Sequence, residues 1–243
     1  MDLIIRIDRR AWQGHVFGST TSLTDTPLVM GSHYLGVSFK PGQSRHFLRV
    51  AAMEITDRYE PAKGLISLDL CDMPERIHGQ DIFARLDAML ERHLRGACPE
   101  RSPLDAAISA LELSRGALSV AEAAAIVGKS VRQFERLFRE TVGVSPKLFS
   151  QIARFRRASH LITNSSLPLV QIASMLGYTD QSHMTREFKR FADLPPASYA
   201  DGHVAFLQDR HPQVFTMGSP NHAQQGETHE ILDRSGDRKG QQI

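Results

Sequence analysis

The most informative part of this sequence is a pair of related segments, Val120-Ala-Glu-Ala-Ala-Ala-Ile-Val-Gly128 and Leu169-Val-Gln-Ile-Ala-Ser-Met-Leu-Gly177. Their glycines are 49 positions apart, and after one extra residue the spacing becomes 50. That spacing then pairs Phe134 with Met184. Two copies of one supersecondary unit rarely arise by chance. The repeat therefore predicts a duplicated structural unit.

Each copy has the features of a helix-turn-helix. A short apolar helix contains a small residue, Ala124 or Ala173, and ends at a glycine that can adopt a positive φ. A second helix begins within about three residues of that glycine. We expect Ser130 to cap the second helix in the first copy, and either Asp180 or Thr179 to cap it in the second.

The second helix of each copy is amphipathic, with an apolar stripe opposite a basic face. One such face could simply be the solvated side of a core helix. Its recurrence on both helices that follow a tight glycine turn favours a nucleic-acid surface instead. The predicted inward residues are Phe134, Leu137 and Phe138 in the first copy and Met184, Phe188 and Phe191 in the second.

A helix of this kind fits the major groove of DNA, where Arg can bind guanine through two hydrogen bonds and Gln can bind adenine. The role of Glu135 stays open, because cytosine could donate to it whereas phosphate would repel it. The expected base-reading residues are Arg132, Gln133, Arg136, Gln181, Ser182, His183 and Arg186. The expected phosphate contacts are Lys129, Arg139, Lys189 and Arg190. Arg154, Arg156 and Arg157 fit either phosphate contacts or ion pairs with acids.

A further helix connects the two copies. Ser145 and Pro146 have the N-cap and first-turn signature, and the helix is expected over about residues 147–162. Because a rigid helix fixes the separation of the two reading helices, we expect them to enter successive major grooves of double-stranded DNA, roughly 34 Å apart.

The rest of the chain predicts an α+β fold. Residues 1–70 contain short apolar runs broken by Gly and Pro, which indicate a small barrel-like sheet. Residues 80–94 form an amphipathic helix whose stripe either closes the core of this half or mediates dimerisation. The predicted division is a β-rich domain over residues 1–98, a linker over 99–103, a helical DNA-binding domain over 104–200, and a largely disordered extension over 201–243.

Composition is ordinary for a globular protein: 243 residues, 41% hydrophobic and 23% charged, with a net charge of +2. Positive charge is concentrated in residues 103–200, which hold 12 Lys and Arg against 8 Asp and Glu.

The cysteine content favours a reducing, cytoplasmic setting. Two cysteines, Cys71 and Cys98, are too few for a zinc cage or a disulfide framework. The N-terminus lacks signal-peptide features, and no apolar run is long enough to span a membrane.

The sequence gives little support to an enzyme. His15, His33 and His46 are too widely spaced to predict a metal site in the β-rich half. Two cysteines do not supply the cluster that a methyl-accepting DNA-repair protein needs, and no phosphate-binding loop or nucleophile elbow is present. We therefore predict no catalytic residue, no metal site and no cofactor.

The helical half resembles the AraC/XylS-type transcriptional regulators. The resemblance lies in residues 172–191, in Leu194-Pro-Pro-Ala-Ser-Tyr199 and in Arg136-Leu-Phe-Arg-Glu-Thr-Val-Gly-Val-Ser-Pro146, and it departs at Asp193, where many members have glycine. It implies a bacterial, sequence-specific regulator, more often an activator, that contacts DNA through both units and has RNA polymerase as a partner.

The N-terminal half is similar to the β-rich sensory domain of one branch of these regulators. The similar segments are Gly36-Val-Ser-Phe-Lys-Pro-Gly42, Phe47-Leu-Arg-Val50, Glu54-Ile-Thr-Asp-Arg58 and Val204-Ala-Phe-Leu-Gln-Asp209. The resemblance implies a small-molecule effector. Such domains usually have further strands before the segment matching residues 1–5, which leaves two interpretations, an incomplete barrel or a mis-assigned start of the sequence. The alternative is a half that only forms a homodimer or binds a protein partner.

Overall fold

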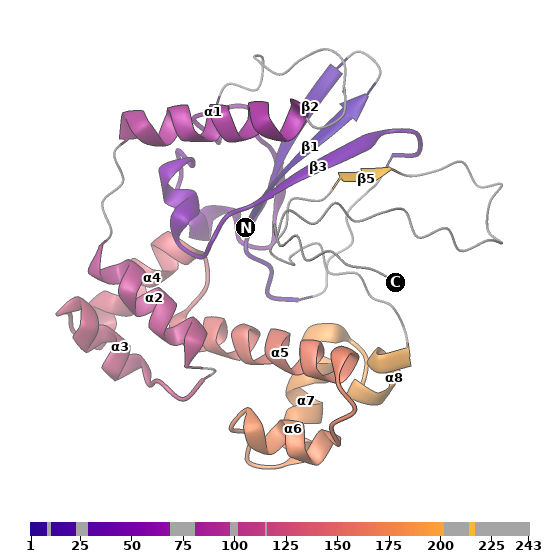
Figure 1. The fold of residues 1–243 in the computed structure, drawn as a ribbon. Helices are drawn as coiled ribbons and strands as arrows, with labels where there is room; N and C mark the ends of the chain where they lie inside the picture. The colour runs from indigo at the N-terminus through magenta and orange to yellow at the C-terminus, as the bar shows by residue number, and fades with distance from the viewer. Residues whose placement is uncertain are drawn as a thin grey trace, which may run out of the picture.

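The N-terminal half of the computed structural model is built on an open antiparallel sheet (Figure 1). Strands β1 (Asp2–Asp8), β2 (Ala11–Phe17) and β3 (His33–Ser38) lie within residues 1–70, where the short apolar runs predict a sheet. Strands β4 (Tyr59–Pro61) and β5 (Val214–Thr216) complete the order β4-β2-β1-β3-β5. The structure describes residues 1–8, 11–22, 29–68, 81–97, 102–114, 116–201 and 214–216.

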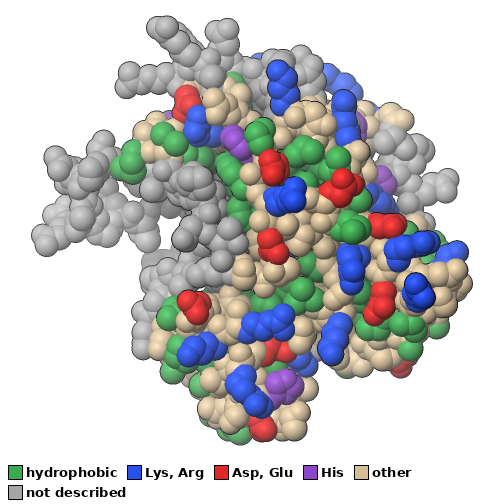
Figure 2. Space-filling view, turned by 180° about the vertical axis from the view of Figure 1, so that it is seen from behind, with side chains coloured by type: hydrophobic (Ala, Val, Ile, Leu, Met, Phe, Trp, Pro, Cys, Tyr) green, Lys and Arg blue, Asp and Glu red, His purple; other side chains and the backbone are tan. Residues whose placement is uncertain are grey.

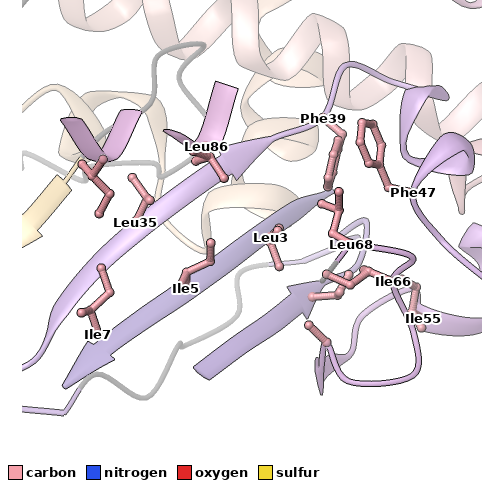
Figure 3. Packing of buried hydrophobic residues seen from close by; sticks show 13 residues of the cluster. Leu3, Ile5, Ile7, Leu35, Phe39, Phe47, Ile55, Ile66, Leu68 and Leu86 are labelled. Carbon is pink, nitrogen blue, oxygen red and sulfur yellow. The ribbon is translucent and has the colours of Figure 1, made fainter. Parts of the chain in front are cut away.

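One face of this sheet is apolar and is covered by helix α1 (Asp81–Ala97). Leu3 and Ile5 of β1 are buried in one hydrophobic core with Ile82 and Leu86 of the helix, and Figure 3 labels Leu3, Ile5 and Leu86 in this core. Phe83, Met89, Leu90 and Leu94 of α1 are partly buried and also pack against this core. The stripe over residues 80–94 therefore closes the core of its own half, which is the first of the two alternatives that the sequence leaves open.

The helical half contains two separate hydrophobic cores. Helices α2 (Pro103–Leu113), α3 (Val120–Val127) and α4 (Val131–Val142) surround the first core. Helices α6 (Leu169–Met175), α7 (Gln181–Ala192) and α8 (Pro196–Asp201) surround the second. The inward stripes are confirmed: Phe134, Phe138, Met184, Phe188 and Phe191 are buried, and Leu137 is partly buried.

Helix α5 (Pro146–Asn164) connects the two cores, as the sequence predicts. Ser145 caps it, because its side-chain oxygen accepts a hydrogen bond from the N–H of Leu148 at 3.3 Å. Phe149 belongs to the first core, whereas Phe155 and Ile162 belong to the second. At about 1.5 Å per residue the helix is about 28 Å long. It is thus a stiff connector whose ends are buried in different cores.

The two halves of the chain also meet directly. Arg45, in the 3-10 helix η1 (Gln43–His46), forms a bidentate ion pair with Asp105 at the start of α2. Its two guanidinium nitrogens each lie 2.8 Å from one carboxylate oxygen of Asp105. Asp105 also accepts a hydrogen bond from the N–H of Ser102. Partial burial alone would raise the pKa of Asp105, but the hydrogen bonds from Arg45 and Ser102 outweigh it and lower that pKa to about 2.

Several expectations fall on residues outside those that the structure describes. These are the cysteines Cys71 and Cys98, residues 99–101 of the expected linker, and most of the extension over 201–243. Within the described ranges, no helix is both long and apolar enough to cross a bilayer.

We predict that Gly18→Ala strongly destabilises the N-terminal half. A Cβ atom at Gly18 would lie 1.6 Å from the carbonyl oxygen of Ile55, so the backbone would have to move. We expect the free energy of unfolding to fall by about 3 kcal/mol or more, measured by urea denaturation. Gly36→Ala is the matched control, because nothing lies within 4 Å of its added Cβ. Equal stability losses in the two variants would contradict this packing argument.

Candidate nucleic-acid interface

The first helix-turn-helix unit is formed by α3, a glycine turn and α4. Gly128 adopts φ 66°, in the left-handed region, and its N–H closes the end of α3. Ser130 caps α4 through a reciprocal arrangement: its hydroxyl accepts from the N–H of Gln133, and the Gln133 side chain accepts from the N–H of Ser130 at 3.1 Å. The predicted cap is confirmed, and it presents the first turn of α4 at the surface.

The second unit repeats this geometry with α6 and α7. Gly177 adopts φ 71° in the turn. The carboxylate of Asp180 accepts a hydrogen bond from the N–H of His183 at 2.6 Å, so Asp180, rather than Thr179, caps α7. Ala124 and Ala173 are both buried, which allows the helices of each unit to approach closely.

Most of the expected DNA-contacting side chains lie on the outer surface of α4 and α7, and Lys129 lies in the turn before α4. Figure 2 shows Lys and Arg side chains spread over the lower part of the molecule, where the helical half lies, with fewer acidic ones among them. Arg136 lies 4.0 Å from Glu140, but its side chain is 77% exposed, so this ion pair is weak. The exposed residues of this set are Lys129, Arg132, Gln133, Arg136, Arg139, Gln181, Ser182, Arg186, Lys189 and Arg190.

Two of the expected base readers have other contacts as well. The side-chain oxygen of Gln133 is held by Ser130 in the cap, which leaves its NH2 group as the outward donor. His183 is half-buried, and its ring meets the ring of Tyr178 edge-on, with centroids 5.4 Å apart. Both residues therefore have fewer free atoms and fewer free rotamers than the exposed arginines.

A buried polar cluster joins α7 to the connector α5. Glu187 of α7 accepts hydrogen bonds from Arg154 of α5 at 3.1 and 2.7 Å and from the hydroxyl of Tyr178 at 2.8 Å. The Arg154 guanidinium also lies over the Tyr178 ring, 4.3 Å from its centroid. Arg154 thus pairs with an acid, which was one of the two roles open to it; Arg156 and Arg157 are exposed.

The cluster keeps a charge pair in the interior of the second unit. The side chains of Glu187 and Arg154 are only 5% and 14% exposed. Burial raises the pKa of the Tyr178 hydroxyl, and the neighbouring Glu187 raises it further, so this hydroxyl stays protonated and donates. Sequence reasoning missed Glu187. The available signal was its position, because the repeat pairs this acid with the apolar Leu137.

The described part of the chain contains no group of three or more His, Cys, Asp or Glu side chains that could hold a metal ion. His15, His33 and His46 accordingly do not form a metal-binding group there. The chemistry of the site is that of exposed donors on two capped helices.

Family comparisons divide the chain in two. Residues 109–202 match a family described as a helix-turn-helix domain, and residues 1–61 match a domain of unknown function (DUF6597).

Among curated proteins, the probable transcriptional regulator LumQ of Photobacterium leiognathi is 30% identical over 82 residues, which are 34% of this chain and 33% of LumQ. The HTH-type transcriptional activator RhaS of Escherichia coli O139:H28 is 29% identical over 79 residues, 32% of this chain and 28% of RhaS. The chain therefore matches well under half the length of either relative.

Solved structures with similarity to the helical half include a transcriptional regulator of the AraC-type DNA-binding domain-containing proteins from Chromobacterium violaceum. It is 29% identical, with a TM-score of 0.39, over 41% of this chain and 89% of that chain. Another is the DNA-binding domain of AdpA, a global transcriptional factor, in complex with a target DNA: 26% identical, TM-score 0.39, over 42% of this chain and 92% of that chain.

We predict that Arg154→Leu destabilises the chain more than the double change Arg154→Leu with Glu187→Leu. The single change leaves the buried carboxylate without its cation, at a cost of about 3–5 kcal/mol in the free energy of unfolding, whereas the double change removes both charges. Urea denaturation of both variants measures this.

The control is Arg95→Leu. Its i,i+4 ion pair with Glu91 is exposed, so the loss should stay within about 0.5 kcal/mol. A double variant at least as unstable as Arg154→Leu would show that the charge pair itself stabilises the second unit.

Proposed function

We propose that this chain is a sequence-specific regulator of transcription of the AraC/XylS type that binds double-stranded DNA through α4 and α7. The match of residues 109–202 to a helix-turn-helix domain family supports this proposal. One observation carries the proposal. Two helices, α4 and α7, occupy equivalent positions of a repeat, and each begins at a capped, exposed turn. One face of each helix is an apolar stripe buried in a core, and the opposite face presents arginines outward. The transcriptional regulators LumQ and RhaS, which this half resembles, support the same function.

Within this function, we propose direct base reading by the arginines nearest the start of each helix. Arg132 and Arg136 of α4 and Arg186 of α7 are exposed and lie within the first two turns, where a helix in the major groove comes closest to base edges. Gln181, Ser182, Gln133 and His183 would read neighbouring bases. The cations Lys129, Arg139, Lys189 and Arg190 would bind the phosphate backbone and set the register.

The stiffness of α5 supports simultaneous binding of both helices. Since α5 has its ends in two different cores, the separation of α4 and α7 would stay fixed when DNA binds. We propose that the two helices occupy successive major grooves, roughly 34 Å apart. The proposed division of labour is a DNA-binding domain over residues 104–200 and a β-rich regulatory domain over residues 1–98.

We propose that the β-rich domain binds a small-molecule effector on the sheet face turned away from α1. On this face His15 stacks on Tyr59, with ring centroids 4.6 Å apart, and Arg6 lies on the neighbouring strand. Nothing lies within 4 Å of the position that a Cβ of Gly36 would occupy. Burial and then Arg6 lower the pKa of His15, so its ring is a neutral donor and acceptor for a planar polar ligand.

Further partners follow from the regulatory role. The activator RhaS supports activation over repression, and with it a contact to RNA polymerase. A second copy of this chain would have to use a surface other than the stripe of α1, which is filled by the core of its own half. We propose a location in the bacterial cytoplasm, because the proposed partner is DNA, and we propose no catalytic role.

The function is tested by selecting sites from a randomised duplex pool with the full chain. We expect one common motif of about two helical turns. Arg132→Ala and Arg186→Ala should each cost about 1–3 kcal/mol of binding free energy and relax preference at one base pair, in different halves of the motif. Lys189→Ala should weaken all sites alike and reduce the salt slope by about one.

Arg95→Ala, on α1 in the other half, is the matched control for loss of a surface cation and should leave binding unchanged. Absence of any enriched motif with the unaltered chain would overturn the proposed function. Equal losses on specific and random DNA for every substitution would overturn the assignment of base readers.

The effector site is tested by thermal-shift screening of the full chain against small polar aromatic compounds. A compound that binds only the folded chain must raise the midpoint of unfolding. We expect Tyr59→Leu, which removes the partner ring of His15, to abolish the shift. A compound that stabilises this variant and the unaltered chain equally would place the site elsewhere.

A further inference from the structure

The C-terminal end of the first reading helix is held by hydroxyl groups from the N-terminal half. The hydroxyl of Ser19 donates to the carbonyl oxygen of Val142 at 2.6 Å. The hydroxyl of Thr56, which follows the 3-10 helix η2 (Ala52–Ile55), donates to the carbonyl oxygen of Gly143 at 2.7 Å. The last carbonyls of a helix have no partner within that helix. Two side chains more than 80 positions away in the sequence supply those partners here.

A comparison of the two units shows that this contact is built into the sequence. The repeat pairs Gly143 with Asp193, and both end their helices with positive φ, at 95° and 56°. Gly143 is buried, and a Cβ there would lie 2.9 Å from the Thr56 hydroxyl and 3.1 Å from that of Ser19. Asp193 is exposed. A side chain is therefore tolerated at the end of α7 but not at the end of α4, where the N-terminal half approaches the backbone.

A second set of contacts fixes the same unit. Gly42 lies against the side chains of Ile108 in α2 and Thr141 in α4, as the short distances from its Cβ position to these groups show. The Arg45–Asp105 ion pair anchors the start of α2 nearby. Helices α2 and α4 are thus attached as one block to the segments around η1 and η2.

The attached end of α4 is opposite to its reading end. Arg132 and Arg136 lie in the first two turns, whereas Val142 and Gly143 lie at the other end of this 12-residue helix. At about 1.5 Å per residue, the ends are separated by about 16 Å. The N-terminal half can therefore hold α4 without covering the side chains that would enter the groove.

We propose that Ser19 and Thr56 are positioning residues for DNA reading by the first unit: through the carbonyls of Val142 and Gly143 they set the direction in which α4 presents Arg132 and Arg136. This inference rests on the proposed function and deepens it, because it assigns the orientation of one reading helix to contacts from the N-terminal half. The orientation of α7 is set differently, by the Arg154–Glu187–Tyr178 cluster inside the helical half.

The test uses the full chain and the motif that the unaltered chain selects. Arg132→Ala and Arg186→Ala first identify which half of the motif each unit reads. Binding is then measured on the intact motif and on two altered motifs, each with one half changed. The variant is Ser19→Ala with Thr56→Val, which removes both hydroxyls and keeps similar side-chain volumes.

We expect this variant to lose discrimination at the first unit's half by about threefold to tenfold, and to keep discrimination at the second unit's half. Ser67→Ala is the matched control, because Ser67 also donates a part-buried hydrogen bond to a backbone carbonyl, that of Phe47, within the N-terminal half. Thr56→Ser keeps a hydroxyl and should restore most of the discrimination when compared with Thr56→Val.

A general loss of stability would lower discrimination in both halves of the motif, and such an equal loss would overturn the proposal. Unchanged discrimination in both halves would overturn it as well. If the double variant does not fold, judged by its thermal transition, the single variants Ser19→Ala and Thr56→Val carry the same test. If the unaltered chain selects a motif but the double variant keeps its discrimination at both halves, this inference fails while the proposed function stands. If the unaltered chain selects no motif, the proposed function itself fails.

Discussion

Helix α5 belongs to two hydrophobic cores at once, and the geometry of the helical half depends on this sharing. Phe149 is buried with the helices of the first unit, and Phe155, Ala158 and Ile162 are buried with those of the second. Neither unit can rotate about α5 without exposing these side chains to water, at about 25 cal/mol per Å² of apolar surface. The relative placement of α4 and α7 is therefore a property of packing, and DNA would meet two helices whose separation is already set.

The features that could be predicted from the sequence are those encoded by nearby residues. The stripes of Phe134 and Phe138 and of Met184 and Phe188 follow from the period of a helix. The cap at Ser130 and the start of α5 at Ser145 and Pro146 follow from local turn chemistry. These elements each depend on residues within a few positions of one another, so periodicity and capping rules suffice to place them.

The contacts that could not be predicted join residues far apart in the sequence. Nothing near Ser19 indicates that its hydroxyl meets Val142, 123 positions later, and the ion pair of Arg45 with Asp105 is equally remote. The apolar stripe of α1 shows the same limit, because periodicity reveals an apolar face but not the surface that covers it. Glu187 was visible only as an acid in an apolar position, and its partner Arg154 lies 33 positions earlier. Of the candidate site, the exposed cations were therefore predictable, and the groups that hold them in place were not.

The unequal ends of α4 and α7 bear on how such proteins can be recombined. The end of α7 at Asp193 is exposed and accommodates a side chain. The end of α4 at Gly143 is in close contact with Ser19 and Thr56, which leave no room for a side chain there. A graft that imports a foreign second unit has to match only α5, including Arg154. A graft that imports a foreign first unit must also bring its own glycine and the hydroxyl-bearing segments of its parent's N-terminal half. In chains of this design, exchange of the second unit should accordingly be tolerated more readily than exchange of the first.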